Sequence, residues 1–210
     1  MNACLRAGRV PVHKMLGAGA VTLGQASPES HPNKGNTVAA DSELIYRGNA
    51  MTINREHVVF PDGKQGELEI VRHPGGAGAV AIDAQERVCL IRQFRYAAGA
   101  WLWEIPAGRM EPGEAPAVTA ERELAEEAGL LASQWSSLGE VLPSPGICDE
   151  RIHLFLAQGL SATPMTHDAL EFIEVHWLPL SEAVQWALRG DISDAKTLAA
   201  LLRAQAQFQK

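Results

Sequence analysis

The sequence predicts an α+β protein in which short strands outnumber helices. Two observations support this fold class: strand-like and helix-like segments do not alternate regularly, and polar turns separate the strand-like segments. A regular alternation would instead favour a doubly wound parallel sheet. We expect an N-terminal extension over residues 1–41, a strand and hairpin subdomain over 42–75, and a larger domain over 76–210.

The composition is that of a globular protein and excludes several classes. The 210 residues are 46% hydrophobic and 20% charged. A net charge of −7 argues against broad binding to nucleic acid, which requires a basic surface. No run approaches the roughly 18 apolar residues of a membrane-spanning helix. Cys4, Cys89 and Cys148 form no closely spaced pair, which argues against a disulfide framework or a zinc site and favours a cytoplasmic setting.

The first 40 residues differ from the rest of the chain. They are rich in Gly, Ser, Pro and Asn, and four basic residues against one acidic residue give them a charge of +3. Because they show no sustained periodicity, we expect a mobile extension. Two alternatives stay open: the run from Met15 to Leu23 weakly resembles a secretory signal, or the start codon is assigned too early.

Strand and helix patterns begin at about residue 42. Residues 57–60 and 67–72 are typical of two strands joined by a tight turn at 61–64. Further strands are expected at 80–82, 88–91, 101–105, 152–157 and 173–178. Helices are expected at 115–128, 181–189 and 194–207, the first of them followed by Gly129 where a helix C-cap belongs.

The first expected helix carries an unusual set of acidic residues. Glu123, Glu126 and Glu127 have i, i+3 and i+4 spacing, so one helical face presents three carboxylates. No lysine between Gly108 and Leu130 relieves their repulsion. Hard divalent cations with oxygen ligands, Mg²⁺ with Mn²⁺ as the alternative, suit this face. The three glutamates alone are more typical of an acidic surface helix.

The complete pattern favours the metal site. It is Gly108, five residues, Glu114, seven residues, then Arg-Glu-Leu-Ala-Glu-Glu-Ala-Gly-Leu up to residue 130. This pattern resembles the signature of the Nudix hydrolases at all seven fixed Gly, Glu and Arg positions. The resemblance implies an α/β/α sandwich of mixed sheets. It also implies Mg²⁺-dependent hydrolysis of a nucleoside diphosphate linked to another group.

We call the segment from Gly108 to Leu130 the box. Residues outside the box resemble the branch that hydrolyses ADP-ribose and sugar nucleotides. They are Gln-Phe-Arg-Tyr at 93–96, Trp-Glu-Ile-Pro-Ala-Gly at 103–108, Pro-Ser-Pro-Gly at 143–146 and the run 190–197. In that branch, a proline near the position of Pro145, 15 residues after the box, accompanies ADP-ribose hydrolysis.

The resemblance also implies roles for individual residues. The metal ligands would be Glu123, Glu127 and the backbone carbonyl of Ala107, with Glu126 assisting them in catalysis. Arg95 would contact the diphosphate, since a guanidinium offers paired donors to phosphate oxygens. The other candidate substrate-binding residues are Tyr96 and Trp103, which could stack on adenine, Glu104, which could bind either substrate or metal, and Glu150, which could bind the terminal ribose.

The catalytic base is less well defined. Glu171 matches the last acidic residue of a loop that often supplies the base in this branch, whereas Ala169 stands where relatives often have an acid. We favour Glu171; Asp168, or metal coordination alone, is the alternative. A second departure is Leu68, where relatives often have an arginine on the N-terminal strand; either Arg72 replaces it, or the diphosphate is bound differently.

The function expected from the resemblance is Mg²⁺-dependent hydrolysis of ADP-ribose to AMP and ribose 5-phosphate. Another nucleoside diphosphate derivative, such as a nucleotide sugar, NADH or coenzyme A, is the first alternative. A noncatalytic nucleotide-sensing module is the second, although such modules tend to lose the box glutamates. The resemblance also implies a homodimer formed through about residues 42–72, and an isolated hairpin would need such a surface to cover.

Overall fold

The computed structural model describes residues 41–166 and 172–208. The expected N-terminal extension lies outside these residues apart from Asp41, which begins the first strand. All the described residues belong to one compact unit, Thr37–Lys210. Within the described residues, none of the helices combines the length and apolar character that a membrane crossing requires.

Residues 41–72 form a three-stranded antiparallel sheet in the order β1-β2-β3, which we call the N-terminal sheet. The expected hairpin is confirmed as β2 (Thr52–Val59) and β3 (Gln65–Arg72). Its turn is closed by a hydrogen bond of 2.8 Å from Phe60 N to Lys64 O. The sequence did not predict the third strand, β1 (Asp41–Arg47), in which every residue is exposed.

The second sheet is a mixed sheet of seven strands. Its main path is β10-β5-β4-β9-β8, while β6 pairs with β5 and β7 pairs with β4. The β4–β9 pair is parallel and the other pairs are antiparallel. The strands are β4 (Gly76–Ile82), β5 (Arg87–Arg95), β6 (Ala100–Glu104), β7 (Ala107–Arg109), β8 (Leu130–Val141), β9 (Ile152–Ala162) and β10 (Ile173–Pro179).

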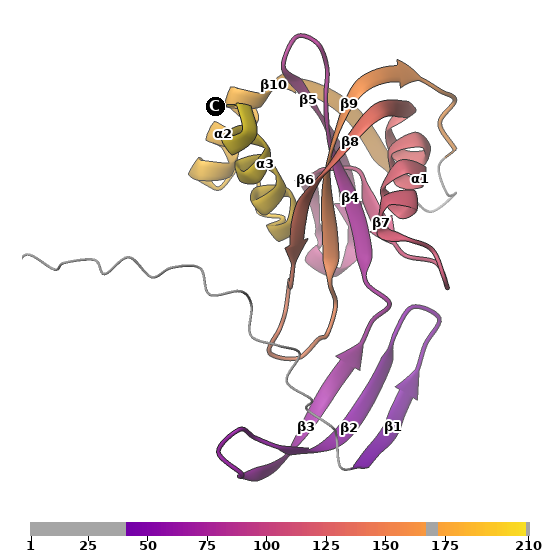
Figure 1. Cartoon of the computed structure of the whole chain (residues 1–210), viewed down its shortest axis with the longest axis vertical. Helices are drawn as coiled ribbons and strands as arrows, with labels where there is room; N and C mark the ends of the chain where they lie inside the picture. Colours follow the sequence, from indigo (N-terminus) through magenta and orange to yellow (C-terminus); the bar gives the residue numbers. More distant parts are fainter. Residues whose placement is uncertain (1–40, 167–171, 209–210) are drawn as a thin grey trace, which may run out of the picture. The chain divides into compact units, whose positions relative to one another are not determined.

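Helices cover both faces of this sheet (Figure 1). Helix α1 (Pro116–Ala128) lies on one face, and α2 (Leu180–Arg189) and α3 (Ala195–Phe208) lie on the other. Strand β4 is buried throughout. Its alternation sends Val80 and Ile82 to the α2/α3 side and Ala79 and Ala81 to the α1 side. The expected α/β/α sandwich is therefore confirmed.

Strand β8 is the main element that the sequence analysis missed. It is the terminal strand of the main path and pairs only with β9 along that path. A register shift between Ser137 and Gly139 interrupts its ladder, and Leu138 is its only buried residue. An exposed strand with a bulge lacks the apolar alternation by which strands are recognised.

Local sequence explains both ends of α1. Pro116 occupies the first helical position, where its missing N–H costs nothing. Gly129 ends the helix with φ 65°, and its amide donates to Ala125 O. Leu124 and Ala128 pack towards the sheet, while the acidic residues of the box lie on the remaining surface of the helix.

Replacing Leu124 with Ala should lower the free energy of unfolding by about 2–5 kcal/mol, because it leaves a cavity between α1 and the sheet. Urea denaturation measures this change. Val118→Ala is the matched control, since Val118 lies on the same helix and is 51% exposed; it should cost less than about 0.5 kcal/mol. Equal losses for the two variants would contradict this packing.

Candidate active site

A polar cavity of about 640 Å³ opens beside the box. It brings together Arg95 from β5, the loop that contains β7, and the acidic face of α1. The residues that line it are Ala50, Arg95, Ala107, Gly108, Arg109, Glu111, Arg122, Glu123, Glu126, Glu127 and Thr166. We call it the box cavity. Every residue expected to bind metal, together with Glu126 and Arg95, lines it.

Arg122 organises the carboxylates of the box. Its Nη1 donates to Glu123 Oε1 at 2.7 Å and to Glu126 Oε2 at 2.9 Å. Its Nε donates to Glu114 Oε1 at 3.0 Å, and its Nη2 donates to Arg109 O at 3.1 Å. One guanidinium therefore holds two carboxylates of α1 and the loop that precedes the helix.

The pKa values in this cluster follow from the same bonds. The hydrogen bond from Arg122, assisted by the Glu111 amide, lowers the pKa of Glu114 to about 2. The bond to Glu114 and those to Glu123 and Glu126 raise the pKa of Arg122 despite its partial burial. The ionised pairing is thus retained across the neutral pH range.

The loop before α1 approaches the helix closely at two points. Glu127 is only 3% exposed, and its Oε2 accepts a 2.8 Å hydrogen bond from Ala107 N. A Cβ atom at Gly108 would lie 2.0 Å from Glu123 Oε1, so no residue but glycine fits there without displacing that carboxylate. The loop therefore forms a close cradle for the two expected metal ligands.

Arg95 reaches the box cavity from a buried anchor. Its Nε and Nη2 each donate to Glu104 at 2.7 Å. Burial alone raises the pKa of Glu104, but the Arg95 hydrogen bonds and the nearby Lys196 outweigh it and lower that pKa to about 2. Glu104 is 1% exposed, so it lies behind Arg95, and its expected contact with substrate stays a prediction.

The structure does not bring three other expected substrate-binding residues into the box cavity. Tyr96 is 92% exposed. Trp103 packs edge-on against Trp186 of α2, at 5.2 Å between ring centroids. Glu150 pairs with His73 Nδ1 at 3.3 Å. Trp103 thus belongs to the hydrophobic packing on the α2/α3 side of the sheet.

The two candidate bases, Glu171 and Asp168, lie outside the described residues. On the N-terminal side of that segment, Thr166 lines the box cavity, and its amide donates to Glu126 O at 3.3 Å. On the C-terminal side, Phe172 O accepts from Phe94 N of β5, also at 3.3 Å. The role of Glu171 stays a prediction.

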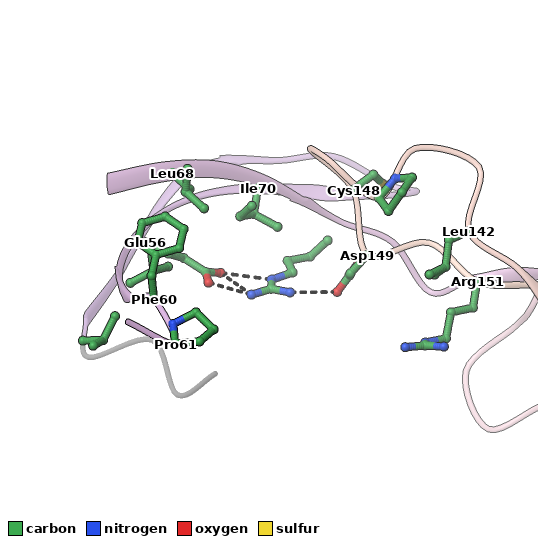
Figure 2. Close-up of a pocket in the computed structure, with 13 residues that line it drawn as sticks. Glu56, Phe60, Pro61, Leu68, Ile70, Leu142, Cys148, Asp149 and Arg151 are labelled. Atoms are coloured by element: carbon green, nitrogen blue, oxygen red, sulfur yellow. Dashed lines mark hydrogen bonds and ion pairs between the residues drawn. The ribbon is translucent and has the colours of Figure 1, made fainter. Parts of the chain in front are cut away.

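Arg72, the expected substitute for the missing arginine at Leu68, lies at a different site, a cavity that Glu56 and Asp149 also line (Figure 2). It donates to both carboxylate oxygens of Glu56 and to Asp149 Oδ2 at 3.0 Å. It lines a mostly apolar cavity of about 520 Å³ with Leu68, Phe60 and others. Two carboxylates therefore already neutralise Arg72, and it does not line the box cavity.

Comparisons with known proteins identify the family of this chain. The model of the NUDIX domain family matches residues 72–201. The chain belongs to the NUDIX family. The match includes the box and the seven-stranded sheet around it, so the family and the fold expected from the sequence are both confirmed.

Curated relatives of this Nudix protein cover most of its length. The ADP-ribose pyrophosphatase of Bacillus subtilis is 37% identical over 161 residues, which is 76% of this chain and 87% of the relative. The ADP-ribose pyrophosphatase of Mycobacterium tuberculosis is 36% identical over 168 residues, which is 79% of this chain and 81% of the relative. The methanol dehydrogenase activator of Bacillus methanolicus is 38% identical over 170 residues, which is 79% of this chain and 91% of the relative.

A solved structure confirms the fold independently of sequence. The crystal structure of an ADP compounds hydrolase superposes with a TM-score of 0.70 over 81% of this chain and 92% of that chain. The two share 20% sequence identity, so this likeness shows the Nudix fold alone.

The donors of the box suit a divalent cation, which Nudix hydrolases generally use. Glu123, Glu126, Glu127 and the Ala107 carbonyl are all oxygen donors on one cavity. Within residues 41–166 and 172–208, no three His, Cys, Asp or Glu side chains already form a metal-binding group. Instead, Arg122 draws Glu123 and Glu126 towards itself, and a divalent ion would compete with it for the same oxygens.

The buried Glu104 should make stability depend on acid pH. Because its folded-state pKa is about 2 and its ordinary value is 4.5, its contribution is complete above pH 4.5 and is lost as pH falls towards 2. That contribution is on the order of 3 kcal/mol. Urea denaturation should show the stability gap between wild type and Glu104→Gln narrowing by about 2 kcal/mol from pH 6 to pH 3. A constant gap would contradict the ion pair.

Proposed function

We propose that this Nudix protein hydrolyses ADP-ribose to AMP and ribose 5-phosphate with bound Mg²⁺. The observation that carries the proposal is the box cavity, in which a guanidinium held by a buried carboxylate faces a cluster of three glutamates. The similarity to two ADP-ribose pyrophosphatases, over about four fifths of each chain, supports the choice of substrate.

The residues of the box cavity divide the work of binding between them. Glu123, Glu127 and the Ala107 carbonyl would hold Mg²⁺, and Glu126 would assist. When bound, the ion would neutralise negative charge on the diphosphate and polarise it for attack. Arg95 would bind the diphosphate oxygens, since its guanidinium is already oriented by two hydrogen bonds to Glu104.

The reaction adds one water molecule across the diphosphate. The water oxygen bonds to one phosphorus, the bond from that phosphorus to the bridging oxygen breaks, and the bridging oxygen leaves with the other phosphate. We assign removal of the water proton to Glu171, which lies outside the described residues. One product is AMP and the other is ribose 5-phosphate.

Product analysis on a substrate panel tests the proposed substrate. Purified protein with Mg²⁺ is incubated with ADP-ribose, ADP-glucose, GDP-mannose, NADH or coenzyme A, and the products are separated by chromatography. We expect the highest kcat/KM with ADP-ribose, and EDTA should stop the reaction. A higher value for another compound would favour the alternative substrate class, whereas no turnover with Mg²⁺ or Mn²⁺ would favour the nucleotide-sensing module.

Glu127→Gln should reduce kcat by about 100-fold or more, because it removes a charged oxygen donor from the metal site. Folding should persist, since the amide oxygen of glutamine can still accept the Ala107 N–H bond. Glu121→Gln is the matched control, because Glu121 is an exposed glutamate on the same helix. Circular dichroism checks the fold, and kcat above about 10% of wild type would contradict the assignment of Glu127.

We also propose that the protein is a homodimer formed through its N-terminal sheet. Large apolar side chains of this sheet are exposed in the single chain: Leu44 at 45%, Tyr46 at 53% and Leu68 at 39%. Leu68 and Phe60 also line the apolar cavity of Figure 2. Apolar surface exposed on one small sheet is typical of a protein interface, and a second copy of the chain would cover these side chains.

Light scattering after size-exclusion chromatography tests the dimer. Wild type should show twice the chain mass of 22.6 kDa. Leu68→Glu should shift the population to the monomer, because it places an unpaired charge in the interface. Leu188→Glu is the control, since Leu188 is 64% exposed on α2, far along the chain from the N-terminal sheet. A Leu68→Glu dimer as stable as wild type would contradict this interface.

A further inference from the structure

A largely buried lysine stands behind Arg95, the residue that we propose binds the diphosphate. Lys196 lies in the first turn of α3 and its side chain is only 11% exposed. Its Nζ contacts Glu104 Oε2 and lies 3.1 Å from Asp194 Oδ2. Lys196 does not line the box cavity. It reaches the site through Glu104, whose two oxygens also bind Arg95.

The start of α3 is fixed relative to Glu104 by a set of short hydrogen bonds. Asp194 Oδ2 accepts from Thr197 N at 3.0 Å and from Thr197 Oγ1 at 2.6 Å. Thr197 Oγ1 in turn accepts from Ile105 N, the residue after Glu104, at 2.9 Å. The lysine is therefore held in place from both sides, by the helix start and by the end of β6.

The charges of this cluster balance. Glu104 and Asp194 are two carboxylates, with side chains 2% and 17% exposed, and Arg95 and Lys196 are their two cations. Without Lys196, Arg95 would be the only one of these cations left to neutralise both carboxylates. The surroundings of the guanidinium would then carry one additional negative charge, and partial burial would strengthen its effect.

Arg95 keeps part of its binding capacity for a ligand. Its side chain is 39% exposed, and Nε and Nη2 are occupied by Glu104. Among the described residues, Nη1 has no hydrogen-bond partner. We propose that Lys196 is a positioning residue, which neutralises the Glu104–Asp194 pair so that Arg95 can bind the diphosphate of the substrate. This inference rests on the proposed function.

Lys196→Met removes the charge and keeps most of the apolar stem. We expect KM for ADP-ribose to rise about tenfold while kcat stays within about threefold of wild type. The reason is that Arg95 would bind the diphosphate less tightly by a similar amount in the ground state and in the transition state. Calorimetric titration with ADP and Mg²⁺ should show a similar rise in Kd, and it does not depend on turnover. Lys196→Arg keeps the positive charge, so its KM for ADP-ribose and its Kd for ADP should stay within about twofold of wild type.

Two further variants separate positioning from a structural role. In an Arg95→Ala background, Lys196→Met should have less than a twofold further effect, because the residue through which it acts is gone. Asp194→Asn should rescue Lys196→Met, since it restores the charge balance while keeping an acceptor for Thr197. A loss caused by poor packing would not be rescued by removing a second charge. Lys64→Met, at a lysine 81% exposed that pairs with Asp62, should change nothing.

The outcomes distinguish this inference from the proposed function. If the wild-type protein binds ADP but hydrolyses no compound of the panel, the proposed function is overturned. The ADP titration still tests the role of Lys196 in that case. The positioning role would be overturned if KM and Kd of Lys196→Met stayed within twofold of wild type. It would also be overturned if Lys196→Met weakened binding equally in the Arg95→Ala background, or if the wild-type protein did not bind ADP. If Lys196→Met does not fold, Lys196→Gln and the Asp194→Asn double variant replace it in the same comparisons.

Discussion

The site depends on the repulsion among carboxylates that share one helix face. Glu123, Glu126 and Glu127 lie within one turn of α1, and Arg122 lies beside two of them while also holding Glu114. The same guanidinium binds the carbonyl of Arg109 and so fixes the loop before the helix. The loop places Ala107 and Gly108 against Glu127 and Glu123. The cavity therefore has its shape because one cation satisfies several anions.

The sheet beneath this cluster explains how the loop and the helix approach each other. Strand β4 is built of small residues at its start, and a Cβ at Gly78 would lie 2.6 Å from the Cβ of Ala107. Small side chains there allow β7 to pair with β4 directly under the box. On the other side, Arg95 is fixed by Glu104 across the β5–β6 pair. The close approach of Gly78 to Ala107 and the pairing of Arg95 with Glu104 thus bring separate parts of the chain to one polar cavity.

The sequence predicted the elements with strong local signals and failed where the signal depended on tertiary contacts. The box helix was expected at 115–128 and extends over Pro116–Ala128, because alanine-rich composition and a C-cap glycine are local features. Strands β1 and β8 were missed because most of their residues are exposed and show no clear alternation. The motif and the resemblance that it supports found Glu123, Glu126, Glu127 and Arg95, all of which line the box cavity.

Sequence patterns gave less information about partners that are distant along the chain. The contact of Glu104 with Lys196, 92 residues away, required the structure. Trp103 was proposed as a stacking residue, yet it packs against α2, and an aromatic residue on a strand is more often part of the core. Arg72 was proposed as a substitute for a missing arginine, but its neutralisation by Glu56 and Asp149 could not be seen in the sequence.

Titration of the metal-free protein with Mn²⁺, followed by electron paramagnetic resonance, tests most directly whether the acidic face of α1 is a cation site. Free Mn²⁺ gives a sharp signal that is lost on binding, so the titration needs no substrate. We expect saturable binding by wild type that is lost in the Glu123→Gln/Glu127→Gln double variant and retained in Glu121→Gln. Equal binding by wild type and the double variant would place the ion elsewhere and contradict a cation site on α1.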